Sequence, residues 1–252
     1  MRKNRAITLL VLIYLLIPVI FTVLYSLTYD WQNTLMPGGV TIKHYVSLFT
    51  NPRFYFAILR SVVTAVLAIV INFVILMPVL YQAKMHYPVV DRILRPLAMV
   101  PFAISGVILA VGLLKMYAVV LSGSAVLLIA AYSVVILPFM YQGIRNTMDN
   151  LNLNALVYAA QTLGASEWQA FWQVVFPNLL KGVRISVLLS FALLMGEFVL
   201  ANILVGGNYE TVQVFMYWSR GVSGHYSSAI VTVYFLLVAM VSMAASSKKE
   251  VL

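Results

Sequence analysis

Residues 156–182 read LVYAAQTLGASEWQAFWQVVFPNLLKG and lie between two apolar runs. Asn152 or Asn154 can cap a first helix here, and Gly164 fits the left-handed position that often ends a helix. The apolar residues of this first helix fall on one stripe, which consists of Leu156, Ala159, Ala160 and Leu163. The pattern predicts a helix that stops at a sharp turn.

A second helix is predicted directly after the turn. Ser166 and Gln169 have the spacing of a capping box, and an apolar stripe follows, formed by Trp168, Phe171, Trp172 and Val175. Pro177 is predicted to end or kink this helix, because proline has no backbone N–H. A capped helix pair with small alanines on one face suits docking into a groove of a partner. On periodicity alone, a pair that only covers neighbouring helices fits equally well.

The composition around this stretch is that of a membrane protein. Hydrophobic residues make up 63% of the 252 residues and charged residues 9%, and the mean hydropathy is +0.97. A helix needs about 20 apolar residues to cross a bilayer. Six such spans are predicted: Ile7–Thr28, Phe54–Ala83, Pro96–Ala118, Ser124–Ile144, Val183–Val205 and Tyr226–Ser246. We therefore expect an all-α membrane protein with one transmembrane domain over residues 1–252.

Basic residues predict how these spans are oriented. Eleven lysines and arginines fall on one side of the predicted spans and five on the other. Because cytoplasmic loops carry the excess of basic residues, both termini and residues 145–181 are predicted to be cytoplasmic. The same asymmetry accounts for the net charge of +9, so nucleic acid is not an expected partner. The chain has no cysteine, which excludes disulfides and thiolate metal sites.

Residues 145–181 closely resemble the coupling loop of binding-protein-dependent ABC importer permeases. The family pattern is Glu-Ala-Ala, three residues, Gly, nine residues, then Ile-x-Leu-Pro, and it fits Ala159, Ala160, Gly164 and Pro177. The family's Glu is replaced here by Tyr158, which removes one charged contact. The resemblance implies the type I permease fold of six transmembrane helices. It assigns coupling to the ATPase to Tyr158, Ala159, Ala160, Leu163, Gly164, Ala165, Ser166 and Pro177.

The resemblance also implies a set of partners. These are a dimer of ATP-binding cassette ATPases, a second permease subunit that is homologous or identical, and an external solute-binding protein. The setting is the bilayer of a bacterial cytoplasmic (inner) membrane. The chain contains no Gly-x-x-x-x-Gly-Lys loop, so ATP and Mg²⁺ would be used by the partner ATPase. This chain is predicted to be a non-catalytic subunit with no catalytic residue, bound cofactor or metal site.

Polar residues within the spans are candidates for the substrate path. Glu197 lies in FALLMGEFVLAN, and an ionisable residue inside a membrane indicates function unless it is paired or solvated. Asn202 and Asn72 are further candidates. Residues 99–114 and 195–207 look most like permeases for polyamines such as spermidine and putrescine, with phosphonate (2-aminoethylphosphonate), sulfate and ferric-ion systems as alternatives. An ion-coupled secondary transporter and an intramembrane protease are more distant alternatives.

Overall fold

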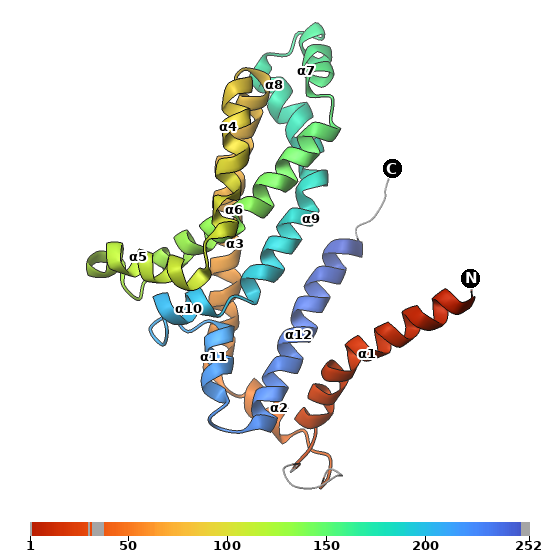
Figure 1. Ribbon diagram of the computed structural model, residues 1–252, viewed down its shortest axis with the longest axis vertical. Helices are drawn as coiled ribbons and strands as arrows, with labels where there is room; N and C mark the ends of the chain where they lie inside the picture. Colours follow the sequence, from red (N-terminus) through yellow and green to blue (C-terminus); the bar gives the residue numbers. More distant parts are fainter. Residues whose placement is uncertain (1, 30, 32–37, 248–252) are drawn as a thin grey trace. The chain divides into compact units, whose positions relative to one another are not determined.

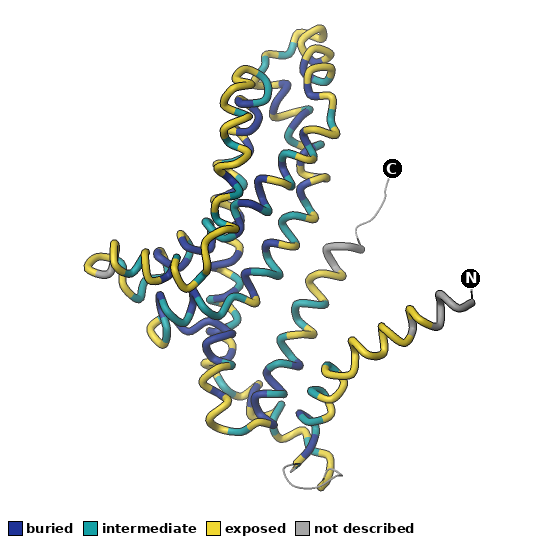
Figure 2. The backbone as a smooth tube through the Cα atoms, in the orientation of Figure 1, coloured by how far each residue is buried: buried dark blue, intermediate teal, exposed yellow. Residues whose placement is uncertain are grey.

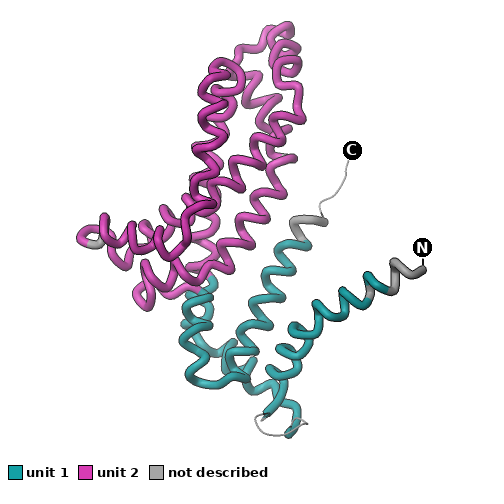
Figure 3. The backbone as a smooth tube through the Cα atoms, in the orientation of Figure 1, with its two compact units in different colours: residues 1–58, 212–252 teal, residues 59–211 magenta. Residues whose placement is uncertain are grey.

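The computed structural model describes residues 2–29, 31 and 38–247, and these form helices joined by short connections. One isolated antiparallel bridge pairs Thr28 with Val40. The chain divides into two compact units, one of residues 1–58 and 212–252 and the other of residues 59–211 (Figure 1; Figure 3). The all-α expectation is confirmed for the described residues.

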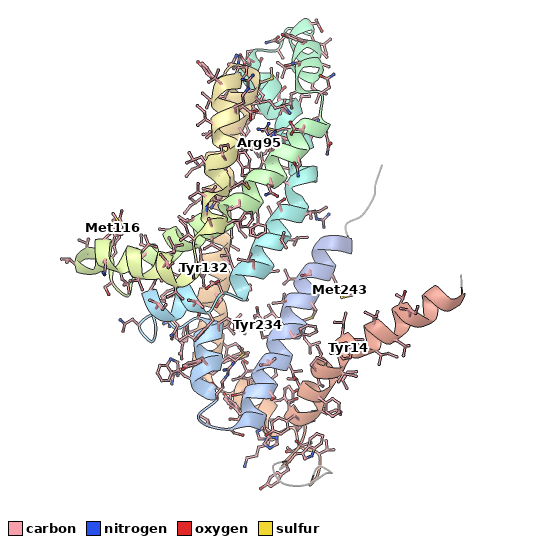
Figure 4. All side chains as sticks on the ribbon, viewed as in Figure 1. Tyr14, Arg95, Met116, Tyr132, Tyr234 and Met243 are labelled. Atoms are coloured by element: carbon pink, nitrogen blue, oxygen red, sulfur yellow. The ribbon has the colours of Figure 1, made fainter. Side chains whose placement is uncertain are left out.

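The first unit joins helices from both ends of the chain. It contains α1 (Arg2–Ser26), α2 (Lys43–Phe49), α11 (Val212–Ser219), α12 (Gly224–Ser247) and the first turns of α3 (Pro52–Met85). The ring of His225 stacks on that of Tyr25 at 4.1 Å, which holds the start of α12 against the end of α1. Side chains of α1 from Leu10 to Phe21 are largely exposed, and Tyr14, labelled in Figure 4, is 73% exposed. An apolar helix exposed in this way is suited to a lipid environment.

The second unit contains the rest of α3 and all the remaining elements. These are α4 (Pro88–Met99), the 3-10 helix η1 (Val100–Ala103), α5 (Gly106–Leu121), α6 (Ala125–Asn150), α7 (Leu153–Thr162), α8 (Glu167–Ala170), the π-helix η2 (Phe171–Val175), α9 (Phe176–Met195) and α10 (Val199–Leu204). Its core follows α6, whose residues Leu128, Tyr132, Ile136, Met140 and Ile144 are buried at intervals of four (Figure 2). That interval places them on one face of the helix.

Helices α6 and α9 lie close together because glycines remove side chains at their contact. A Cβ atom added to Gly143 would lie 1.7 Å from Ser186 Oγ. One added to Gly182 would lie 2.3 Å from Thr147 Cγ2. Small residues that let helix backbones approach are the usual packing device of membrane helices.

The predicted count of six spans is met only in part. By length and composition, three helices among the described residues can cross a membrane: Pro52–Met85, Ala125–Asn150 and Gly224–Met243. Two bent helix pairs, Pro88–Ala103 with Gly106–Tyr117 and Glu167–Leu180 with Gly182–Met195, raise the number to five if each pair forms one span. The first predicted span, Ile7–Thr28, is matched only by the shorter apolar helix Leu10–Ser26, so this span and the side of the membrane on which the termini lie remain predictions.

The third predicted span, Pro96–Ala118, is not one straight helix. Residues Pro88–Ala103 and Gly106–Tyr117 are bent by 97° around an extended break at Ile104 and Ser105. The fifth, Val183–Val205, is also interrupted, because α9 ends at Met195 and α10 begins at Val199. Within a membrane, non-helical backbone is tolerated where it is buried in protein or lines a cavity. The two breaks are therefore expected either to be buried in protein or to line a cavity.

Candidate functional site

The first helix of the candidate coupling segment is α7. Its first turn is capped by Asn152, whose Oδ1 accepts a hydrogen bond from Ala155 N at 3.2 Å. The buried face consists of Leu153, Val157 and Ala160. This face is rotated from the predicted stripe, because Ala159 is exposed and Leu163 is 89% exposed. The structure thus leaves apolar side chains of α7 uncovered.

The turn after α7 is closed by backbone hydrogen bonds around Gly164. Its φ is +88°, in the left-handed region that glycine adopts without strain. Gly164 N donates to Gln161 O at 2.9 Å, and Ala165 N donates to Ala160 O at 3.1 Å. Together these two bonds form a Schellman motif, which satisfies carbonyls at the end of a helix. They give Ala160, Gly164 and Ala165 a defined part in the turn.

The second helix begins with the predicted capping box. Gln169 N donates to Ser166 Oγ at 3.2 Å, and Ser166 N donates to Gln169 Oε1 at 2.8 Å. The helix does not end at Pro177, which is the second residue of α9. Irregularities lie on both sides of it, in the π-turn of Phe171–Val175 and in a bend of 56° between Glu167–Leu180 and Gly182–Met195. A proline in a helix removes a hydrogen bond and crowds the carbonyl four residues earlier, and a widened turn relieves that crowding.

Aromatic rings hold this second helix against α3. The ring centroids of Phe171 and Tyr81 are 4.6 Å apart, and those of Phe176 and Phe73 are 6.1 Å apart. Phe171 is 4% exposed, whereas Trp168 remains 69% exposed. One side of the segment is therefore anchored, while its outer side offers an aromatic and apolar surface.

Charged pairs brace the same end of the second unit. Arg145 of α6 binds both carboxylate oxygens of Asp91 on α4. Lys84 of α3 binds Asp149 of α6 at 2.5 Å, and His86 Nε2 lies 2.6 Å from Glu167 Oε1 of α8. Sequence reasoning treated these basic residues only as markers of topology. These acidic partners lie 54, 65 and 81 residues away in sequence, so no local pattern signals the three pairings. A further pair, Arg145 with Asp149 at 3.6 Å, does have the local spacing of four residues.

A cavity of about 330 Å³ lies where the two helix breaks meet. It is lined by Pro101, Phe102, Ile104, Gly106, Leu109, Val134, Val135, Phe139, Leu193, Glu197 and Leu200. We call it the Glu197 cavity, because Glu197 is the ionisable residue in its lining. Glu197 Oε1 accepts a hydrogen bond from Leu200 N at 3.0 Å, at the start of α10. Tyr132, labelled in Figure 4, donates to the backbone oxygen of Glu197 at 3.3 Å.

The other two predicted path residues lie outside the lining of the Glu197 cavity. Asn72 is 5% exposed, and its Nδ2 donates to the carbonyls of Ala68 and Ser133, each at 3.0 Å. The bond to Ser133 ties α3 to α6. Asn202 is half-buried on α10. Of the three predicted residues, only Glu197 borders this cavity.

Comparison with protein families gives one match over most of the chain. The family described as "Binding-protein-dependent transport system inner membrane component" matches residues 75–248. This range includes the candidate coupling segment and the whole lining of the Glu197 cavity.

Individual relatives differ in the solute that they are named for. The molybdenum transport system permease protein ModB of Haemophilus influenzae is 36% identical over 34% of this chain and 38% of its own length. The sulfate transport system permease protein CysW of Synechocystis is 32% identical over 42% of this chain and 41% of its own. The spermidine/putrescine transport system permease protein PotB of Haemophilus influenzae is 27% identical over 77% of this chain and 73% of its own. The chain thus spans less than half the length of the first two relatives.

Solved structures show the same fold. A chain of a bacterial ABC transporter involved in the import of the acidic polysaccharide alginate superposes with a TM-score of 0.77 at 14% identity, covering 98% of this chain and 95% of that one. A second alginate ABC transporter structure, in complex with an alginate pentasaccharide-bound periplasmic protein, gives a TM-score of 0.68 at 17% identity, over 97% and 93% of the two chains.

Proposed function

Since this chain belongs to the family of binding-protein-dependent transport system inner membrane components, we propose that it is the permease subunit of an ATP-driven importer. The observation that carries the proposal is the segment from Asn152 to Ala170. Both of its helices are capped, its turn is closed by two hydrogen bonds, and Tyr158, Leu163 and Trp168 remain exposed. A rigid element with an uncovered apolar face can fit a groove on a partner and pass that partner's motion to the bundle.

The proposed partner at this face is a pair of ATP-binding cassette ATPases. The chain lacks a phosphate-binding loop of its own, so ATP would be hydrolysed by those subunits. A second permease subunit and an external solute-binding protein complete the proposed complex. The alginate transporter that was solved with a periplasmic protein supports this kind of assembly. The excess of basic residues supports a multi-pass arrangement in a bacterial inner membrane with the coupling segment in the cytoplasm.

We propose a polyamine such as spermidine or putrescine as the first candidate solute. The relative named for spermidine and putrescine aligns over 77% of the chain. The carboxylate of Glu197 also suits a cation in the cavity that it lines.

A small oxyanion is the second candidate. Relatives named for sulfate and molybdenum support it. In addition, one carboxylate oxygen of Glu197 already accepts a hydrogen bond from Leu200 N at the start of α10. A carboxylate used as a helix cap is less available to attract a cation. Removing the charge at Glu197 is therefore expected to weaken the uptake of a polyamine but not the uptake of an oxyanion.

Solute-stimulated ATP hydrolysis tests both parts of the proposal. The permease would be assembled in liposomes with its ATPase, partner permease and binding protein, and assayed with spermidine, putrescine, 2-aminoethylphosphonate, sulfate, molybdate and ferric ion. Stimulation by a polyamine supports the first candidate, and stimulation only by an oxyanion supports the second. If no assembled complex hydrolyses ATP in response to any solute, the importer proposal is contradicted.

A further inference from the structure

A second cavity, of about 520 Å³, lies along α6 and α9. It is lined by Gly143, Asn146, Thr147, Asn150, Leu151, Asn178, Gly182, Ile185 and Ser186, and we call it the amide groove. It borders the close contact at Gly143 and Gly182, where α6 and α9 run side by side (Figure 1). Its volume lies within the range of sites for small molecules.

The chemistry of the amide groove is polar and uncharged. None of the nine described residues that line it is charged, and five carry an amide or hydroxyl group. Thr147 Oγ1 donates to Gly143 O within α6, and Asn178 Nδ2 donates to Val174 O in η2. The side chains of Asn146, Asn150 and Ser186 form no hydrogen bond with another described residue. Their donors and acceptors are available to a solute or to water.

The amide groove and the Glu197 cavity lie on the same face of the helix pair. On α6, Val135 and Phe139 line the Glu197 cavity, and Gly143 and Thr147 continue the four-residue steps into the groove. On α9, Ser186 lies seven residues before Leu193, which lines the Glu197 cavity. Seven residues are two helical turns, or about 10 Å. The two cavities therefore follow each other along one face.

The groove ends next to the coupling segment. Asn150 is the last residue of α6, and Leu151 is followed directly by the cap of α7. Unpaired amides and hydroxyls are unfavourable against lipid tails, so this face requires water or protein beside it. A path also needs sites that hold a solute weakly enough to release it. Neutral amides and hydroxyls meet that need better than a fixed charge would.

We propose that the amide groove is the exit section of the solute path, through which a hydrated, hydrogen-bonding solute leaves the Glu197 cavity for the cytoplasm. This inference rests on the proposed importer function and adds to it the face of α6 and α9 that lines the path. The residues expected to meet the solute are Asn146, Asn150, Asn178 and Ser186.

Cysteine labelling of the assembled complex tests the inference, because the chain has no native cysteine. Asn146→Cys and Ser186→Cys place a thiol in the groove, and Leu180→Cys is the matched control on the opposite side of α9. Each variant is exposed to a small charged methanethiosulfonate reagent, without nucleotide and with the ATPases held closed by ATP and vanadate. Labelling after denaturation confirms that every thiol is reactive.

The groove thiols should react without nucleotide and react about tenfold more slowly when the ATPases are closed, because the open state is then a minor one. Modified Asn146→Cys should lose solute uptake, and Leu180→Cys should show no dependence on nucleotide. An unreactive Ser186→Cys, equal rates in both states, or normal uptake after modification would each overturn the inference. If the wild-type complex imports nothing in the solute panel, the importer proposal fails, and labelling of the variants still decides whether the face holds water.

Discussion

A substitution at Gly164 can change the backbone strain of the coupling turn without adding a steric clash. The φ of Gly164 is +88°, and no heavy atom lies within 4 Å of a Cβ placed there. Gly164→Ala therefore adds no clash, and its cost is the left-handed conformation itself, about 1–2 kcal/mol. A cost of that size changes the ratio of formed to frayed turns by a factor of about 5–30. Asn tolerates this conformation, so Gly164→Asn is the matched control.

The informative measurement is the amount of solute imported per ATP hydrolysed in liposomes. We expect Gly164→Ala to lower this ratio about fivefold or more, because a frayed turn no longer holds α7 and α8 as one rigid element. Gly164→Asn should stay close to the wild-type protein. Co-purification with the ATPase establishes that both variants assemble. A normal ratio in Gly164→Ala, or an equal loss in both variants, would refute the reasoning.

Three further predictions follow from contacts in the second unit. Gly143→Ala should lower the thermal stability of the purified protein by overpacking of about 1–3 kcal/mol. Ser186→Gly in the same chain should restore it, because it removes the two closest atoms, Ser186 Oγ and Cβ, and leaves Ser186 Cα at 3.7 Å from the new methyl group. Asp91→Asn should destabilise the protein by about 1–3 kcal/mol, since its partner guanidinium is largely buried. Asp149→Asn should cost less than about 1 kcal/mol, because Asp149 is 45% exposed, and equal losses in thermal unfolding would contradict this difference. Glu197→Gln keeps an acceptor for the N–H of α10, so we expect normal stability and a roughly tenfold loss of polyamine uptake; undiminished polyamine uptake would show that the Glu197 carboxylate does not attract the cation.

Sequence alone predicted the features that depend on neighbouring residues. The cap at Asn152, the left-handed Gly164 and the capping box of Ser166 and Gln169 all depend on residues within a few positions of one another. Such contacts form whatever the rest of the fold does, so a local pattern is enough to find them.

Features that depend on distant packing were not predictable. The break after η1 consists of Ile104 and Ser105 and that after α9 of Gly196, Glu197 and Phe198, and each is too short to divide the apolar run in which a single span was predicted. The buried face of α7 and the role of Asn72 are set by neighbours from elsewhere in the chain, such as Ser133, which lies 61 residues after Asn72. Periodicity shows that a helix has a face, but not which neighbour covers it.

Because of the π-turn of Phe171–Val175, the number of residues between Gly164 and Pro177 sets the direction in which the exposed face of α7 points. A π-turn holds one residue more than an α-turn, and one residue turns a helix by about 100°. Deleting Gln173 would restore a regular helix and swing everything before it, including the exposed face of α7, a quarter turn or more around the axis of α9. The surface offered to a partner would then point in another direction with its sequence unchanged. Substitutions are thus expected to be far better tolerated than insertions or deletions between these two residues.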